Sequence, residues 1–265
     1  MKAKIAVILF CSFLATAQLA NAQGTPSSKA TADINTLVRC HMSTAQIDDT
    51  VTLPTSCVDL FTGSGVAIDA NGFVEIMNAP VKLSNSQSLF VSPSLVTGLY
   101  TQTRTKTSTG TTSTAQAMGG VYLRAVLTDS TGKEIVAAPL SACNGGILGC
   151  TQASNGEWGV MLDSRIQTLT QSLSQCIVDV TSIVGTNDGT CSFTSTIDLI
   201  TKTTSANTFN FIFPKVGQGV YTLRIKAAVA SGASVIGSGT AVGAAAFGLG
   251  SVTAESVRMV HGFEF

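Results

Sequence analysis

The residue types best suited to acid–base chemistry are scarce in this chain. Only two histidines, His41 and His261, are available as imidazole bases. Catalysis by such a base needs a nucleophile beside it and a pKa tuned by its surroundings. The sequence contains no Gly-x-Ser-x-Gly turn, no His-Glu-x-x-His pair and no phosphate-binding loop. We therefore interpret both histidines as structural or surface residues.

Carboxylates are the second group able to carry a reaction. A pair of them flanking a sugar linkage performs glycoside hydrolysis. Among the 15 acidic residues nothing in the spacing selects two, so a hydrolase stays open as an alternative. The possible members of such a pair are Asp48, Asp49, Glu75, Asp129, Glu157 and Asp163.

Aromatic side chains could stack on sugar rings if they are exposed. The candidates are Trp158, Tyr100, Tyr122 and Tyr221, although aromatic residues in a β-sandwich more often lie in the core. Trp158 stands out because Asn-Gly-Glu at residues 155–157 favours a loop directly before it. We predict Trp158 and Tyr100 as ligand-binding residues.

Six cysteines follow the first 22 residues, an even number that favours disulfides in an exported chain. Fifteen pairings are open, and we favour neighbours because each pair then closes a short loop with turn-forming residues. The predicted bridges are Cys40–Cys57, Cys143–Cys150 and Cys176–Cys191. Only Cys40 with His41 approaches the spacing of a zinc site, so we expect no metal there.

One further run resembles part of a metal site. Asp-Ala-Asn-Gly at residues 69–72, with Glu75 nearby, is similar to the beginning of a calcium loop, but Phe73 and Val74 occupy its middle. We interpret the run as a hairpin turn. No metal and no other cofactor is expected.

The first residues have the pattern of a cleavable signal peptide. Lys2 and Lys4 precede a short apolar run, and Ala-Asn-Ala at residues 20–22 is a small-x-small cleavage site. We predict a signal peptide over 1–22, a flexible leader over 23–36 and one domain over 37–265. The mature chain is then secreted, periplasmic or on the cell surface, without a transmembrane helix.

The composition limits the partners. Only 11% of the residues are charged and the formal net charge is zero. No basic stripe is available to neutralise phosphates, so binding to nucleic acid or to an anionic membrane is not expected. The expected partners are a glycan or another extracellular protein, and the sequence leaves oligomerisation open.

Short apolar runs divided by turn residues predict strands over most of the chain. Residues 121–128 and 134–138 flank a Gly-containing turn and predict a hairpin. Residues 220–229 alternate apolar and polar side chains, the pattern of a strand with one buried face. Alternating threonines at 101–109 predict a polar strand or an exposed loop, and residues 165–178 fit either a helix or a strand.

Residues 227–254 carry no charge at all. Their length would suit a membrane helix, but six glycines interrupt them and lower both helix propensity and apolar driving force. We predict two strands or a hairpin of small residues. A membrane-inserting hairpin remains the alternative.

The segments TSANTFNFIFPKVGQGVYTLRIKAAV and GSVTAESVRMVHG resemble the closing strands of jelly-roll sandwiches. Carbohydrate-binding modules and tumour-necrosis-factor-like modules carry such endings, and some uncharacterised exported bacterial proteins are also similar. The resemblance covers about a quarter of the chain, concerns strand pattern, and implies a fold class without transferring a ligand or an active residue.

These observations predict an all-β protein: an antiparallel β-sandwich, jelly-roll-like, with short disulfide-closed loops and at most one short helix. The leading hypothesis is an exported, non-catalytic protein that acts in surface recognition, adhesion or extracellular assembly. A secreted hydrolase with a carboxylate pair, and a protein that associates with membranes through residues 227–254, are the alternatives.

Overall fold

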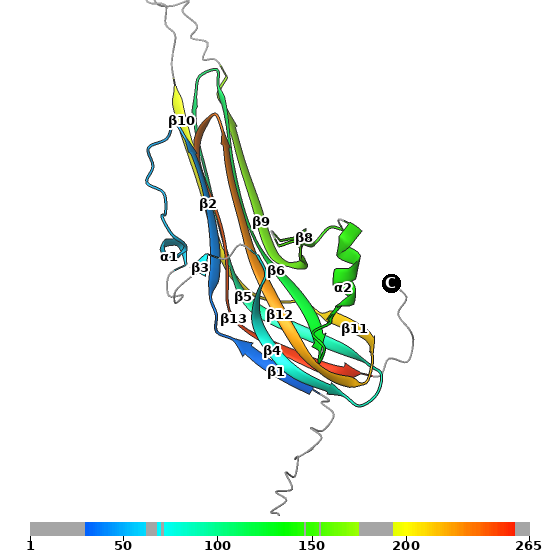
Figure 1. Ribbon diagram of the computed structural model, residues 1–265. Coiled ribbons are helices and arrows are strands. Elements are labelled where there is room, and N and C mark those ends of the chain that lie inside the picture. The colour runs from blue at the N-terminus through cyan, green and yellow to red at the C-terminus, as the bar shows by residue number, and fades with distance from the viewer. Residues whose placement is uncertain are drawn as a thin grey trace, which may run out of the picture.

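The computed structural model describes residues 30–61, 68–69, 72–145, 147–153, 155–174 and 193–257 of the chain. These residues form two sheets that pack face to face along a long, narrow molecule (Figure 1). Every strand pair is antiparallel except for a two-residue parallel contact between β2 and β3. The predicted all-β sandwich is confirmed.

The first sheet, sheet A, contains the longest strands of the described chain. Its order is β10 (Thr194–Thr208), β5 (Gln87–Ser108), β13 (Ser238–Val257), β2 (Arg39–Ile47) and β3 (Ile68–Asp69). At its lower end in Figure 1, β1 (Ala30–Asn35) pairs with β13 and β11 (Phe211–Val216) pairs with β5.

The second sheet, sheet B, has the order β4 (Val74–Leu83), β12 (Gly219–Ile236), β6 (Thr112–Asp129), β9 (Trp158–Ser172) and β8 (Cys150–Gln152), with β7 (Glu134–Val136) beside β6. The four long strands of each sheet therefore run β2-β13-β5-β10 and β4-β12-β6-β9. That order is the one produced by two Greek keys wound into a jelly roll. The expected jelly-roll arrangement is thus present.

Short helices occur only in the connections of the described chain. They are α1 (Cys57–Leu60), α2 (Ala138–Ser141) and a 3-10 turn, η1 (Ala142–Gly145), which makes one more short α-helix than we predicted. α1 and α2 lie on opposite sides of the sandwich (Figure 1). The carboxylate of Asp59 accepts hydrogen bonds from the backbone N–H of Thr55 and of Ser56, which fixes the turn into α1 and lowers the pKa of Asp59.

The predicted flexible leader is corrected by β1. We expected residues 23–36 to lie outside the sandwich, but residues 30–35 pair with β13 from Ala30↔Glu255 to Asn35↔Gly250. The small, polar side chains that suggested a leader suit an edge strand because such a strand buries little side-chain area. Residues 1–29, which include the predicted signal peptide, lie outside the described residues.

Most strand predictions agree with the structure. The predicted hairpin forms between β6 and β7, with Leu127 opposite Ile135. β9 covers residues 158–172, so the part of the ambiguous 165–178 segment that is described is a strand. Residues 227–254 form the end of β12, a turn at Gly237 and most of β13, so the predicted two strands are confirmed; they lie in opposite sheets and do not pair as a hairpin.

A proline lies within β11. β10 ends at Thr208, and β11 continues through Pro214 with an irregular register between Phe213 and Val216. Proline is tolerated at this position because a residue in a bulge makes no ladder hydrogen bond that the missing N–H would remove.

The main core lies in the lower half of the sandwich. Alternate residues of the facing strands point inward and are fully buried, as the alternation in residues 220–229 predicted. Large side chains fill this space, among them Phe211, Phe213, Phe247, Leu123, Leu223 and Ile225.

The upper half, which we call the arm, has a different interior. The arm comprises residues 101–108 of β5, 112–119 of β6 and the strand segments paired with them. The predicted threonine strand lies here, but Thr101, Thr103, Thr105 and Thr107 face inward and are completely buried. Of the two predicted alternatives, the polar strand is confirmed and the exposed loop is wrong.

Glutamines of β9 make this burial possible. Thr101 donates to Gln167 Oε1 at 3.0 Å and Thr105 to Gln171 Oε1 at 2.9 Å, while Gln167 Nε2 donates to Thr103 Oγ1 at 2.8 Å. Buried hydroxyl and amide groups are costly only when they lack partners, and these satisfy one another.

Glycines allow the two sheets of the arm to approach closely. A Cβ atom on Gly243 of β13 would lie 2.3 Å from Met118 O and 2.4 Å from Gly232 O, both in sheet B. A Cβ atom on Gly119 of β6 would lie 2.5 Å from Ala244 O. Close sheet packing thus explains why glycine occupies position 243 in the uncharged segment 227–254.

Candidate functional site

A cleft of about 470 Å³ opens beside α2, where β9 begins. It combines one large aromatic side chain with polar and charged groups, and its lining residues include Arg124, Ser141, Asn155, Glu157 and Trp158. Trp158 is half-buried and packs with one part against the main core. The remaining part faces the cleft, so the predicted ligand-binding residue lies at a concave site.

A tight turn holds the groups that precede Trp158. Glu157 O accepts from Ala153 N at 2.9 Å, and Gly156 has a positive φ of 81° that favours glycine. The side chain of Asn155 accepts from Glu157 N at 3.2 Å and donates to Glu157 Oε2 at 2.7 Å. The predicted loop is therefore ordered by its own side chains and presents Asn155 at the rim.

Arg124 and Glu157, which line the cleft, belong to a network of four charged residues. Lys226 Nζ lies 2.8 Å from Glu157 Oε1 and 3.5 Å from Glu134 Oε1. Arg124 lies 3.6 Å from Glu157 and 3.8 Å from Glu134, and its Nη1 donates to Trp158 O at 2.9 Å. The charges of the two cations and the two carboxylates sum to zero, so these four groups make the cleft polar without giving it a net charge.

The network determines the protonation of Glu157. Partial burial alone would raise the pKa of this carboxyl, but hydrogen bonds from Lys226 and Asn155, with the charges of Lys226 and Arg124, outweigh it and lower the pKa below its ordinary value of 4.5. A general acid for glycoside hydrolysis needs a raised pKa. The environment of Glu157 does not favour that role.

This lowered pKa predicts a pH-dependent stability. Ionised Glu157 is favoured in the folded state, so its contribution is present above the unfolded pKa and is lost as the pH falls through the lower folded value. We expect Glu157→Gln to be less stable than the original protein at pH 7, by less than about 1 kcal/mol because solvent screens the pair. Thermal melts at several pH values would show this difference shrinking below about pH 4; a constant difference would contradict the assignment.

Tyr100, the other predicted ligand-binding residue, lies elsewhere. It is on β5 in sheet A and packs against a small cluster around Cys40, Leu60 and Phe61, and its hydroxyl donates to Gln102 Oε1 at 3.1 Å. Burial, followed by the charge of Asp198, raises the pKa of Tyr100. The structure does not bring Tyr100 and Trp158 into one site.

Two predicted disulfides are confirmed. Cys40–Cys57 fastens the segment before α1 to β2, and Cys143–Cys150 joins η1 to β8 close to the Trp158 cleft. Cys176 and Cys191 lie outside the described residues, so their predicted bridge stays a prediction.

The other acidic candidates are held by separate partners. Asp49 pairs with Arg104 at 3.1 Å, Glu75 pairs with Arg224 at 3.0 Å, and Asp129 accepts hydrogen bonds within its own turn. Asp163 accepts from Thr97 at 2.6 Å and from two neighbouring β10 side chains. Glu157 alone of the six predicted acids lines the cleft, where its closest carboxylate neighbour in the network is Glu134.

The remaining sequence candidates do not add a reactive centre to the described chain. His41 Nδ1 lies 2.7 Å from Ser231 Oγ between β2 and β12, and His261 lies outside the described residues. Within the described ranges, no three His, Cys, Asp or Glu side chains gather as metal ligands. No helix of the described chain is long and apolar enough to cross a membrane.

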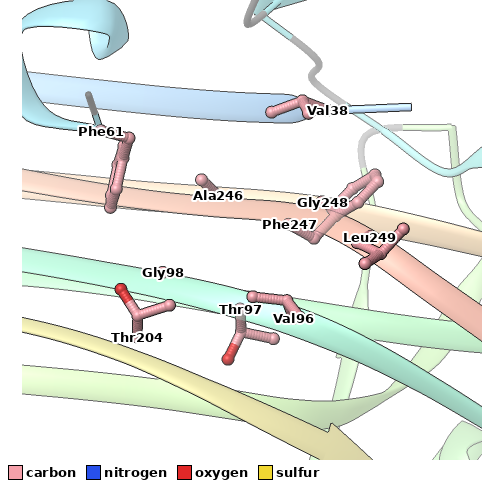
Figure 2. Close-up of a pocket in the computed structure, with 10 residues that line it drawn as sticks. All are labelled: Val38, Phe61, Val96, Thr97, Gly98, Thr204, Ala246, Phe247, Gly248 and Leu249. Atoms are coloured by element: carbon pink, nitrogen blue, oxygen red, sulfur yellow. The ribbon is translucent and has the colours of Figure 1, made fainter. Parts of the chain in front are cut away.

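A second, apolar pocket of about 250 Å³ lies on the outer face of sheet A (Figure 2). Phe61 forms one wall, Val38 and Leu249 line the other end, and Gly98 leaves room for the Phe61 ring at the floor. The pocket coincides with a β-bulge, because the register of β13 on β5 shifts between Phe247 and Gly250.

Sequence analysis missed Arg124 of the cleft, its neighbour Lys226 and the residues of the apolar pocket. Arg124 and Lys226 lie on the polar faces of two strands in which apolar and polar residues alternate. That alternation indicated that both side chains are exposed, but not that the two strands are neighbours in the sheet. Val38, Phe61 and Leu249 gave no signal, since a bulge and a disulfide-held loop create their pocket from distant segments.

No protein-family model and no curated protein matches the chain. A solved structure of infectious bursal disease virus, Gx strain, aligns over 88% of this chain and 41% of its own, with 9% sequence identity and a TM-score of 0.15. The chain thus spans less than half the length of that structure, and a superposition this loose carries no argument about fold or function.

Proposed function

We propose that this protein is an exported, non-catalytic recognition module that binds a neutral glycan in the Trp158 cleft. The observation that carries the proposal is the presence of Trp158, Asn155 and Glu157 in one cleft of about 470 Å³. Ligand sites typically combine an aromatic or apolar surface with a few placed polar groups. A sugar ring offers C–H groups to the indole and hydroxyls to the amide and carboxylate.

The charge balance of the cleft supports a neutral ligand. Arg124 and Lys226 are each within ion-pair distance of both Glu134 and Glu157. An anionic sugar would have to separate these pairs to find a free cation, and a cationic one would meet the opposite difficulty. Hydroxyl groups donate and accept hydrogen bonds without removing either partner from the network.

Export is supported by the cysteines. Cys40–Cys57 and Cys143–Cys150 are bridged in the structure, and disulfides persist mainly in oxidising compartments. Together with the signal-peptide pattern of residues 1–22, they favour a secreted, periplasmic or cell-surface protein.

A titration of tryptophan fluorescence tests the ligand directly, because Trp158 is the single tryptophan of the chain. Neutral glycans that bind on a glycan array, with cello-, manno- and chito-oligosaccharides as the first set, are expected to change its emission saturably. Asn155→Ala removes one exposed amide and is expected to weaken binding about tenfold, the effect of one hydrogen bond of about 1.4 kcal/mol.

Tyr100→Phe is the matched control, since it alters the other predicted aromatic residue on the opposite sheet and is expected to leave affinity unchanged. Two results would overturn the proposal: a folded protein that binds no glycan on the array, or a glycan whose affinity is the same in Asn155→Ala and the original protein.

A further inference from the structure

We propose that β10 is a pairing strand for a second copy of this chain. Two β10 strands would lie antiparallel across a twofold axis, so that two copies of sheet A become one continuous sheet. The inference concerns the side of the sandwich formed by β9 and β10 and does not depend on the Trp158 cleft.

The edge of β10 is long and regular. β10 pairs with β5 over all 15 of its residues without a register shift, and it is the terminal strand of sheet A. At about 3.4 Å per residue the edge extends roughly 50 Å. About half of its backbone N–H and C=O groups point away from β5 and are suited to pair with an added strand.

Two features that normally discourage such pairing, a proline and a bulge, are absent from β10, although Asp198 and Lys202 place charge on the strand. Edge strands are commonly interrupted by proline, a bulge or inward-facing charge. β4, the edge of sheet B, contains Pro80, and its Asn78 N donates to Asp33 Oδ2 at 2.7 Å. β10 contains no proline and no bulge.

Large apolar side chains are exposed along the same strand. Ile197, Leu199 and Ile200 are 43%, 46% and 55% exposed. Phe193, directly before β10, is also exposed. Contiguous exposed apolar side chains on a sheet edge mark interaction sites.

The charges of β10 select one self-pairing register. Asp198, Ile200 and Lys202 alternate along β10 and so share one face, and Asp198 and Lys202 are the charged residues of the strand. If Ile200 lies opposite Ile200 of a second copy, Asp198 of each copy lies opposite Lys202 of the other. A shift of two residues would instead place Asp198 opposite Ile200 or Thr204. The twofold register therefore gives two opposite-charge cross-strand pairs, in addition to the contacts that Asp198 makes with Arg104 and Lys202 makes with Leu60 O within each copy.

β9 orders this edge before pairing. Gln167 Nε2 donates to Leu199 O at 2.8 Å, and Thr201 donates to Gln167 Oε1 at 2.9 Å. A pre-ordered strand loses little conformational entropy when a partner binds. On pairing, a backbone N–H of the incoming strand replaces the Gln167 bond to Leu199 O.

The expected association is of moderate strength. Fifteen strand residues on each side are fewer than the roughly 20–30 residues of a standard interface. We expect a dimer with a dissociation constant of about 1–100 μM.

Sedimentation velocity of the full mature chain tests this register with charge variants. The original protein is expected to dimerise with rising concentration. Asp198→Lys and Lys202→Asp alone each place like charges opposite one another twice per dimer, and each is expected to weaken dimerisation at least tenfold.

An equimolar mixture of the two variants is expected to recover the original affinity, because every cross-strand pair then joins a lysine with an aspartate. Val220→Lys, at an exposed position of β12 away from β9 and β10, is the control and is expected to leave the dimer unchanged. Circular dichroism checks that each variant is folded.

The proposal is overturned by an original protein that stays monomeric at the highest concentrations, by dimers insensitive to both substitutions, or by no recovery on mixing. The response of Trp158 fluorescence to glycans is expected to be the same in all these variants, so failure of one proposal is distinguishable from failure of the other.

Discussion

Gly243→Ala is expected to destabilise the protein by about 2–3 kcal/mol, near the upper end of the usual effect of overpacking. The added methyl group would lie 2.3 Å from Met118 O and 2.4 Å from Gly232 O. Both neighbours are backbone atoms of sheet B, so the clash is relieved only by moving the two sheets of the arm apart. For a chain of this size the melting temperature would fall by roughly 5–10 °C.

The same strand provides the control. A Cβ atom on Gly248 of β13 would have Val38 Cγ2 at 3.8 Å as its nearest neighbour, an ordinary contact. Gly248→Ala is expected to be neutral or slightly stabilising because alanine restricts the unfolded chain. Thermal unfolding of both variants measures the difference; equal melting temperatures would mean that the sheets of the arm are not closely packed.

Removing the Cys40–Cys57 bridge is expected to cost about 3 kcal/mol, the chain-entropy value for a loop of this size. The bridge spans 17 residues and ties the segment that includes α1 to β2. Asp49, in the same segment, pairs with Arg104 and accepts from Thr240 at 2.9 Å, so part of the loop remains attached in the double variant Cys40→Ala/Cys57→Ala. Denaturant unfolding gives the free energy, and limited proteolysis shows whether residues 48–61 become accessible.

Cys143→Ala/Cys150→Ala is the matched comparison, since that bridge spans only 7 residues and its entropic contribution is about 2.5 kcal/mol. It is expected to leave the proteolysis of residues 48–61 unchanged. If the double variant at Cys40 and Cys57 kept its stability within about 0.5 kcal/mol, the bridge would not be what holds α1 against sheet A.

Strand pattern and turn chemistry made much of the fold predictable. The alternation around Leu223 and Ile225 indicated the buried face correctly, and the resemblance of the closing strands implied the jelly roll whose order the sheets show. Two bridges were predictable because short cysteine spacings enclose turn residues. Each of these signals comes from a short stretch of sequence, and the structure that it indicates depends on local backbone geometry.

Features that depend on the distance between the sheets were not predictable. The threonines at 101–107 are polar, and sequence alone gives no reason to bury them. Their burial depends on Gln167 and Gln171, which follow more than 60 residues later in the chain. Gly243 likewise has a reason only when Met118 of the other sheet lies opposite.

The candidate site was predictable only in part. The Asn-Gly-Glu sequence identified the loop beside Trp158, while Lys226 meets Arg124 and Glu157 because β6 and β12 are neighbours in sheet B. Tyr100 was singled out for its residue type, and its neighbours on β5 carried no information about which face it occupies.

Nuclear magnetic resonance of ¹⁵N-labelled protein measures the central claim most directly, because the chain yields one indole N–H signal, that of Trp158. Addition of a neutral oligosaccharide selected on the glycan array is expected to move this signal saturably, together with backbone signals of residues 155–158. An indole signal that stays in place while the sugar binds elsewhere would contradict recognition at this cleft.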